Sequence, residues 1–247
     1  MEKQLVKLVH ATPNAENLVS YMARVSAPKN QENFDTAPKL IKYLMKHSHW
    51  SPFEMVNMCV EINTTRDIAA QILRHRSFSF QEFSQRYADV RELGSLEVPQ
   101  LRRQDTKNRQ NSIPDLDKGL EFQLKTQVTE LFNRAQDLYS SMLNYGVAKE
   151  SARKILPMNS PSRIYMNGTL RSWIHYIDLR SANGTQLEHQ QIAIECGKIF
   201  AEQFPSINEA YLDWKKDEEK AKNALDAIVE LEAQIATLNA QIKELKG

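Results

Sequence analysis

Cysteine is scarce in this sequence, and its placement argues against two kinds of architecture. Cys59 and Cys196 are the two cysteines among 247 residues, and they lie far apart in apolar surroundings. Neither belongs to a CxxC pair, and no histidine spacing typical of a zinc site accompanies them. We therefore expect neither a disulfide framework nor a bound metal, and we expect a reduced, cytoplasmic protein.

Long apolar runs and an excess of one charge are also missing. The N-terminal segment MEKQLVKLVHATPN has no long apolar core, and no stretch approaches the roughly 20 apolar residues that cross a bilayer. The 32 basic and 31 acidic residues give a net charge of +1, so no global field attracts nucleic acid or an anionic membrane. These absences predict a protein with neither a membrane segment nor a general affinity for nucleic acid.

What the sequence does contain is an ordinary globular composition, with 41% hydrophobic residues, enough for a sizeable core. We expect one main domain over residues 1–214 and an appended segment over residues 215–247. Helical patterns outnumber strand patterns, which predicts an α+β fold. The predicted strands cover residues 4–9, 56–62 and 163–166. The predicted helices are one capped by Asn14 with Leu18, Val19, Met22 and Val25 on its apolar side, then 36–45, 65–74, 117–145, a short helix before Pro157, 169–179, and one from 188.

Residues 94–114 carry few large apolar side chains and many polar ones. We interpret this segment as a mobile loop, and loops of that length commonly serve a function. We expect residues 100–112 to become ordered when a substrate binds.

The C-terminal segment has a heptad pattern. Isoleucine recurs at Ile228, Ile235 and Ile242, and leucine at Leu231, Leu238 and Leu245. Isoleucine at the first core position of the heptad and leucine at the second favour a parallel two-stranded coiled coil. The alternative is an amphipathic helix that folds back on its own domain.

The segment 71–87, QILRHRSFSFQEFSQRY, concentrates groups that bind anions. Gln71, Arg74 and His75 have the spacing of one helical face, so they can converge on one ligand. Guanidinium groups and serine hydroxyls favour a phosphorylated ligand. The alternative is a solvated arginine face paired with Glu82 and Asp89.

A second polar stripe lies in the segment 169–180, TLRSWIHYIDLR. Arg171, His175 and Asp178 share one helical face between apolar residues, an arrangement suited to lining a cleft. A structural role is the alternative for two of the cations in this segment: His175 can be a satisfied surface histidine, and Arg180 can offset the helix dipole.

Together these segments resemble the flavin-dependent thymidylate synthases. The motif RHR followed after seven residues by serine spans residues 74–87 and is highly specific. Further matching segments appear in the family order: RVS at 24–26, KHSHWSPFE at 46–54, ARKILP at 152–157 and TLRSWIHYIDLR at 169–180. The resemblance covers about residues 5–212. One departure is Gln81, where the family usually has asparagine close to the flavin.

The resemblance implies a homotetramer of α+β subunits, each with a mixed or antiparallel sheet, whose active sites are shared between chains. It implies FAD binding by Ser26, Ser51, Glu54, Arg74, His75, Arg76, Glu82, Thr169, Arg171 and His175. It implies dUMP binding by Gln71, Arg74, Glu82, Ser84, Gln85, Arg86, Arg153 and Arg180. The family often has asparagine at the positions of Thr169 and His175. His49 matches a histidine that lines the site beside the flavin.

The resemblance also implies the reaction, methylation of dUMP to dTMP. NADPH is the reductant and methylenetetrahydrofolate is the one-carbon donor. Neither cysteine lies in a motif, so activation by a thiolate is not expected. Arg180 instead stabilises the uracil ring as its N3 loses a proton, while Arg74, Arg86 and Arg153 hold the phosphate. Ser84 lacks a His–Asp partner pattern and is assigned to dUMP binding.

Two other interpretations remain open from the sequence. Residues 74–109 hold eight basic and five acidic residues interleaved with aromatic ones, which also suits single-stranded nucleic acid. The chain could also serve mainly as a coiled-coil scaffold.

Overall fold

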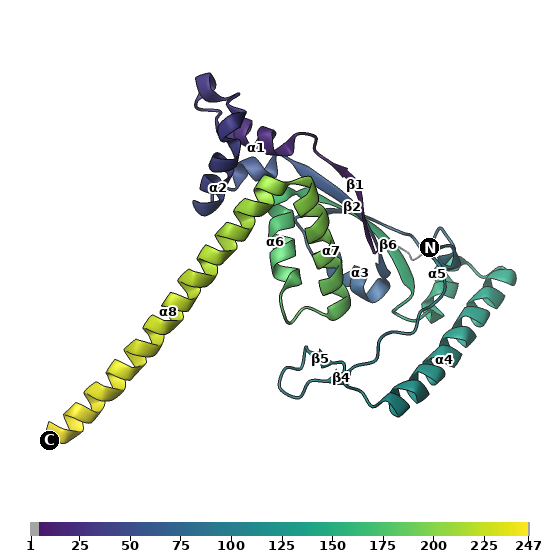
Figure 1. Cartoon of the computed structure of the whole chain (residues 1–247). Helices are drawn as coiled ribbons and strands as arrows, with labels where there is room; N and C mark the ends of the chain where they lie inside the picture. Colours follow the sequence, from purple (N-terminus) through teal and green to yellow (C-terminus); the bar gives the residue numbers. More distant parts are fainter. Residues whose placement is uncertain (1–4, 247) are drawn as a thin grey trace. The chain divides into compact units, whose positions relative to one another are not determined.

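The computed structural model describes residues 5–246, and the side chains of residues 5–238. The described chain divides into two compact units. The first unit contains residues 5–15 and 53–203, and the second contains residues 16–52 and 204–246. Figure 1 shows the elements of both units.

The first unit is built on an antiparallel sheet of four strands in the order β1-β2-β6-β3. The strands are β1 (Val6–Ala11), β2 (Asn57–Thr65), β3 (Ser79–Glu82) and β6 (Pro161–Thr169). The central pair β2 and β6 is in register along its whole length, from Asn57 opposite Thr169 to Thr65 opposite Pro161. A separate two-stranded hairpin joins β4 (Arg103–Gln104) to β5 (Ser112–Ile113).

The two faces of the sheet differ because residues alternate between them. Val60 and Met166 are paired and fully buried on one face. On the other face Glu61 is paired with Tyr165, whose hydroxyl donates to Oε2 of Glu61 at 2.9 Å. One face is therefore the apolar core and the other is polar, as the alternation of residues 56–62 predicts.

Helices of the first unit pack on the apolar face (Figure 1). They are α3 (Arg66–Ile72), α6 (Leu170–Ser181) and α7 (Leu187–Gln203), whereas α4 (Lys118–Asn144) lies to one side and packs on α5 (Lys149–Ala152). The 3₁₀ turns are η3 (Ser51–Glu54), whose first two residues belong to the second unit, η4 (Val90–Leu93) and η5 (Arg153–Ile155). Trp173 of α6 is fully buried, and its indole N–H donates to the carbonyl of Met58 at 2.9 Å. This contact fixes α6 over the middle of the sheet.

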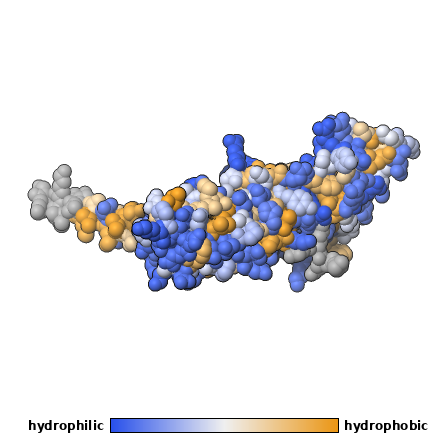
Figure 2. Space-filling model, turned by 90° about the horizontal axis from the view of Figure 1, so that it is seen from above, coloured by the Kyte–Doolittle hydropathy of each residue, from blue (hydrophilic) through white to orange (hydrophobic). Residues whose placement is uncertain are grey.

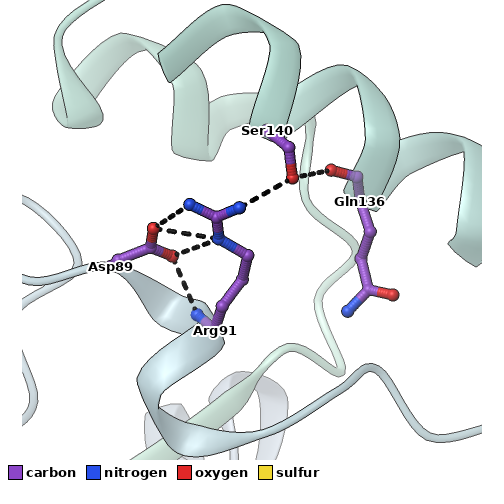
Figure 3. Close-up of polar contacts among 4 residues, drawn as sticks. All are labelled: Asp89, Arg91, Gln136 and Ser140. Carbon is purple, nitrogen blue, oxygen red and sulfur yellow. Dashed lines mark hydrogen bonds and ion pairs between the residues drawn. The ribbon is translucent and has the colours of Figure 1, made fainter. Parts of the chain in front are cut away.

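A compact polar contact joins η4 to α4 (Figure 3). The Asp89 carboxylate accepts from the backbone N–H of Arg91 at 2.9 Å and from its guanidinium at 2.5–3.1 Å. Nη1 of Arg91 then donates to Oγ of Ser140 on α4 at 3.1 Å. Tyr139 lies fully buried in an apolar cluster with Val90. The polar contact and the apolar cluster together anchor the C-terminal half of α4.

The second unit is helical. It contains α1 (Ala15–Ala23), which begins at the last residue of the first segment, η1 (Pro28–Asn30), η2 (Phe34–Thr36), α2 (Ala37–Lys46) and α8 (Pro205–Lys246). Nζ of Lys42 on α2 lies 2.8 Å from Glu209 and 3.0 Å from Asp213 on α8. Oε1 of Glu16 accepts from two backbone N–H groups in the first turn of α8 at 2.6 and 3.1 Å, which caps that helix.

Helix α8 continues without interruption past residue 214. Its side chains Ile228, Leu231, Ile235 and Leu238 are each more than half exposed, and Figure 2 shows apolar atoms along this part of the helix. Leu225 and Val229 are also exposed and widen the stripe. The side chains of Ile242 and Leu245 lie outside the described residues. In the part of the chain that the structure describes, no helix combines the length and apolar character needed to cross a membrane.

The structure differs in detail from three sequence predictions about local structure, and the mobility predicted for residues 94–114 stays a prediction. The helix predicted at 65–74 ends at Ile72, and the chain then turns toward β3. Val25 lies beyond the end of α1 and is 70% exposed, because buried Arg24 bonds to Asn33 and Thr36 and draws the chain out of the helix. The segment 94–114 contains the β4–β5 hairpin, which forms because Asp105 accepts from backbone N–H groups in the turn.

Candidate active site

The junction of β6 and α6 places the second motif. Thr169 caps α6, its hydroxyl accepting from the Ser172 N–H at 3.3 Å, and Oγ of Ser172 donates to the carbonyl of Ser77 at 3.3 Å. Gly168 precedes the cap, and a Cβ built there would overlap the ring of Phe78. A side-chain-free residue at 168 therefore lets the 74–87 segment pack directly against the start of α6.

Arg180 and His75 form the central contact between the two motifs. Nε of Arg180 donates to Nε2 of His75 at 2.9 Å. The His75 ring packs edge-on against Tyr176, with ring centroids 5.0 Å apart, and against Phe78 at 6.4 Å. Two residues that are 105 positions apart in the sequence are thus held together beside the rings of Tyr176 and Phe78.

A second histidine, His189 of α7, extends this arrangement. Its side chain is fully buried, and its ring lies 6.2 Å from that of His75. Nδ1 of His189 lies 3.3 Å from Oε1 of Gln71, whose Nε2 donates to Oε1 of Gln186 at 2.7 Å. Both polar ends of the Gln71 carboxamide are therefore occupied.

Half-buried His75 and buried His189 are both neutral at physiological pH. Burial, followed by the nearby Arg180 and His175, lowers the pKa of His75 to about 4. Burial, followed by Arg180 and His75, lowers the pKa of His189 to about 4. A neutral His75 can accept the hydrogen bond from Arg180, and a positive charge stays on the guanidinium alone.

The polar stripe of α6 is confirmed. Arg171 and His175 are exposed, while Trp173, Ile174 and Ile177 on the other sides of the helix are buried. Nη1 of Arg171 forms an ion pair with Glu54 at the end of η3. The pair brings together two of the predicted flavin-binding residues.

Glu82 lies at the end of the edge strand β3. It is opposite Ile164, so it points to the face of the sheet that the helices cover, and its Oε1 accepts from Ser162 at 3.0 Å. Gln81 is opposite Tyr165 and points to the polar face. The two neighbours therefore belong to different sides of the sheet.

The arginines of the first motif are exposed. Arg74 and Arg76 follow α3 in a turn, so Arg74 and His75 lie just beyond the helix that contains Gln71. Among the described residues, neither guanidinium forms an ion pair. Both are therefore available to an anionic ligand.

The end of the first motif lies against α5. Arg86 pairs with Glu150 at 3.1 Å, and Glu150 precedes Arg153 by three residues, about one helical turn. Gln85 is buried, and its Oε1 accepts from Arg66 at 2.8 Å. Ser84 is exposed.

The remaining predicted residues belong to the second unit. Ser26 and Ser51 are exposed there, and His49 lies edge-on to Tyr43 with ring centroids 6.1 Å apart. Their flavin-binding roles stay predictions.

Three of the four aromatic residues of the first motif do not suit stacking on bases, whereas Tyr87 is 85% exposed. Phe78 is buried against Trp173, with ring centroids 4.9 Å apart, and Phe80 and Phe83 are partly buried. Stacking of nucleobases needs exposed ring faces. The packing therefore disfavours the nucleic-acid interpretation of this segment.

Sequence reasoning missed His189, Gln186, Arg102 and Glu188, which contact the predicted site residues or one another. A signal for His189 exists, because it begins the buried stripe of α7 that continues through Ile192, Ala193, Cys196 and Phe200 at helical spacing. Arg102 lies in a polar run that gives no such signal.

Comparison with known proteins decides the family. The model of the family described as thymidylate synthase complementing protein matches residues 7–206, which contain both motifs. The chain belongs to this family, the flavin-dependent thymidylate synthases.

Two relatives show how far the similarity extends. The chain is 51% identical over 210 residues to a probable flavin-dependent thymidylate synthase of Paramecium bursaria Chlorella virus 1, covering 84% of this chain and 94% of the relative. It is 49% identical over 199 residues to the flavin-dependent thymidylate synthase of Synechocystis sp., covering 81% and 90%. The flavin-dependent thymidylate synthase domain thus accounts for nearly all of each relative.

A solved structure has the same fold. It is the UMP/dUMP methylase PolB from Streptomyces cacaoi, crystallised with 5-Br dUMP. The TM-score is 0.73 at 26% sequence identity, over 84% of this chain and 94% of that chain. The α+β architecture described above is therefore shared with a solved UMP/dUMP methylase.

Proposed function

We propose that this flavin-dependent thymidylate synthase methylates dUMP to dTMP, as a cytoplasmic enzyme. The observation that carries the proposal is the hydrogen bond from Arg180 to a neutral His75. This hydrogen bond holds the Arg180 guanidinium in a fixed direction, next to a histidine that packs on the rings of Tyr176 and Phe78. A fixed cation in a dry site stabilises a uracil ring that has lost the N3 proton, which activates C5 for attack on the one-carbon unit.

The cysteines do not suit the alternative of thiolate activation. Cys59 and Cys196 are both free and buried, and burial raises the pKa of both thiols. A nucleophilic cysteine needs a lowered pKa and access to its substrate. The arginine route is consistent with both cysteines acting as core residues.

The phosphate of dUMP fits the arginines at the other end of the first motif. Arg86 pairs with Glu150, which precedes Arg153 by three residues, and Arg74 is exposed and forms no ion pair among the described residues. Guanidinium forks bind phosphate oxygens in pairs. Gln71, Glu82, Ser84 and Gln85 complete the proposed dUMP site, with Arg180 against the uracil.

FAD is the flavin that fits the remaining residues. Its diphosphate requires cationic and hydrogen-bonding groups, and Arg74, Arg76 and His75 of the first motif offer them. Glu54 and Arg171 are already paired there. The proposed set also contains Ser26, Ser51, Glu82, Thr169 and His175. When bound, FAD supplies the redox chemistry, with NADPH as reductant and methylenetetrahydrofolate as one-carbon donor.

Exposed apolar side chains support assembly into a homotetramer. On α4, Leu131 is 62% exposed and Leu138 52% exposed, two turns apart on one face. Such faces mark interaction surfaces in soluble proteins. The stripe on α8 supports a parallel coiled coil of residues 215–247, appended to a catalytic domain of residues 1–214.

An absorbance spectrum of the purified protein, followed by NADPH oxidation with and without dUMP, tests the function. We expect a flavin spectrum that bleaches with NADPH, faster when dUMP is present, and dTMP as product when methylenetetrahydrofolate is added. A protein that takes up no added FAD, or that forms no dTMP with all substrates present, would contradict the proposal.

A further inference from the structure

Hairpin β4–β5 is connected to the candidate site by a continuous chain of polar contacts. Nε of Arg102, the residue before β4, donates to Oγ of Ser112 in β5 at 2.8 Å. Nη2 of the same guanidinium reaches both carboxylate oxygens of Glu188 on α7, at 2.8 and 3.1 Å. One side chain therefore holds both the hairpin and the helix.

The chain of contacts continues from α7 to the nucleotide-binding motif. Nε2 of Gln186 donates to Oε2 of Glu188 at 3.1 Å, and Oε1 of Gln186 accepts from Gln71 at 2.7 Å. On its other side the Gln71 carboxamide contacts His189 at 3.3 Å. Gln71 is thus oriented from both ends, and one end leads through two residues to the hairpin.

The Arg102–Glu188 pair differs from the surface ion pairs of the same hairpin. The Arg102 side chain is 11% exposed, whereas Arg103 beside it pairs with Asp115 at the surface with both side chains nearly half exposed. Burial acts to raise the pKa of Glu188, but the hydrogen bonds from Arg102 and Gln186 outweigh it, so that the pKa lies below its ordinary value. The Glu188 side chain is 37% exposed, so the pair is partly buried, and its guanidinium, bonded to two partners, couples more strongly than that of an exposed pair.

We propose that Arg102 and Glu188 are positioning residues for Gln71, and that they make hairpin docking and dUMP binding depend on each other. The inference rests on the proposed function, because Gln71 is a proposed dUMP residue. The chain of contacts holds the Gln71 carboxamide in one orientation, with Oε1 toward His189 and Nε2 toward Gln186. Since linkage is reciprocal, dUMP stabilises the docked hairpin by the same factor by which docking strengthens dUMP binding.

The test compares Arg102→Ala with Arg103→Ala, two variants that each remove one arginine from the hairpin. We expect Arg102→Ala to weaken dUMP binding, measured by calorimetry on the FAD-loaded protein, by about fivefold. We expect Arg103→Ala to bind like wild type. Glu188→Gln serves as the milder variant, because it keeps the acceptor for Gln186 but loses the ion pair. We expect it to weaken dUMP binding as well and to leave the melting temperature unchanged.

A double-mutant cycle with Gln71→Ala separates positioning from general destabilisation. If Arg102 acts through Gln71, its removal adds almost nothing in the Gln71→Ala background. Hydrogen exchange at residues 103–113 should slow on addition of dUMP in wild type and not in Arg102→Ala. Equal affinities of Arg102→Ala and Arg103→Ala, or additive effects of the two changes in the cycle, would overturn the inference alone. A wild-type protein that binds no dUMP would overturn it together with the proposed function.

Discussion

Nε of Arg180 lies 2.9 Å from Nε2 of His75, and the histidine is the acceptor because burial and nearby cations hold its pKa at about 4. The direction of the Arg180 guanidinium is therefore set by a residue from the other motif. Its remaining N–H groups keep their capacity to bind a substrate carbonyl. This geometry connects the anion-binding segment to the proposed uracil site.

Arg180→Ala should reduce dTMP formation by a factor of about 10² or more, because the cation that stabilises the developing anion is lost. FAD should stay bound, since Arg180 is not one of the proposed flavin residues and contacts a single one of them, His75. Turnover measured by product chromatography, together with the flavin absorbance of the variant, checks both points. Near-normal turnover would remove the proposed role of Arg180.

Stability should fall between about pH 6.5 and pH 4 because of His189. Its folded-state pKa of about 4 lies below its unfolded value near 6.5, so the unfolded chain binds the extra proton in this range. No stability is lost through this group above pH 6.5, and the loss amounts to about 3 kcal/mol once the pH has fallen to the folded pKa. Urea unfolding across this range should show a flatter pH profile for His189→Leu than for wild type.

Gly168→Ala should destabilise the protein by about 1–3 kcal/mol, the usual result of overpacking a core. The added methyl group meets the ring of Phe78, which has no free space because it also packs on Trp173. Thermal unfolding measures the loss. In a Phe78→Leu background the same substitution should cost less, and an equal loss in both backgrounds would show that another contact is responsible.

Asp89→Asn should weaken the anchoring of α4 shown in Figure 3 by about 1 kcal/mol, since Arg91 loses a charged acceptor. The hydrogen bond from Arg91 is the main reason that the pKa of Asp89 lies below its ordinary value. That stabilisation is present above the unfolded pKa of about 3.9 and is lost as the pH falls through the lower folded value. The free energies of unfolding of wild type and variant, measured by urea unfolding, should therefore differ at pH 7 and become equal in strong acid. A difference that persists at low pH would point to packing alone.

Truncation after Trp214 tests the coiled coil. If residues 215–247 form an accessory coil, gel filtration of the truncated protein still gives the tetramer expected for the catalytic domain. The exposed leucines of α4 favour this outcome, because they lie outside the removed segment. Dimers instead of tetramers would show that the coil holds the assembly together.

Local patterns in the sequence predicted much of the fold because their causes act within a few residues. The stripe of Ile41, Leu44 and Met45 predicted α2, and all three side chains are buried. Thr169 and Asp117 were placed at the starts of helices, and both cap them through side-chain hydrogen bonds. Strand β6 runs from Pro161 to Thr169, longer than the predicted 163–166, because pairing with β2 extends it beyond its apolar centre.

The contacts within the site could not be predicted in the same way, because they join distant parts of the chain. Arg102 and Glu188 are 86 residues apart, and Gln71 and His189 are 118 residues apart. Spacing along a helix says nothing about such pairs. The family motifs indicated which residues matter, but the partner of Arg180 and both contacts of Gln71 became visible only in the folded chain.

The unbroken course of α8 fixes the phase of its apolar stripe. Tyr211 and Trp214 lie in the part of the helix that packs within the second unit, and Ile228 follows Trp214 by fourteen residues on the same continuous spiral. Each residue turns the helix by roughly 100°. A single inserted residue between Trp214 and Ile228 would therefore rotate the whole stripe by more than a quarter turn, whereas an insertion of seven would nearly preserve its direction. The number of residues between Trp214 and Ile228 thus determines the direction in which the apolar stripe faces its binding partner.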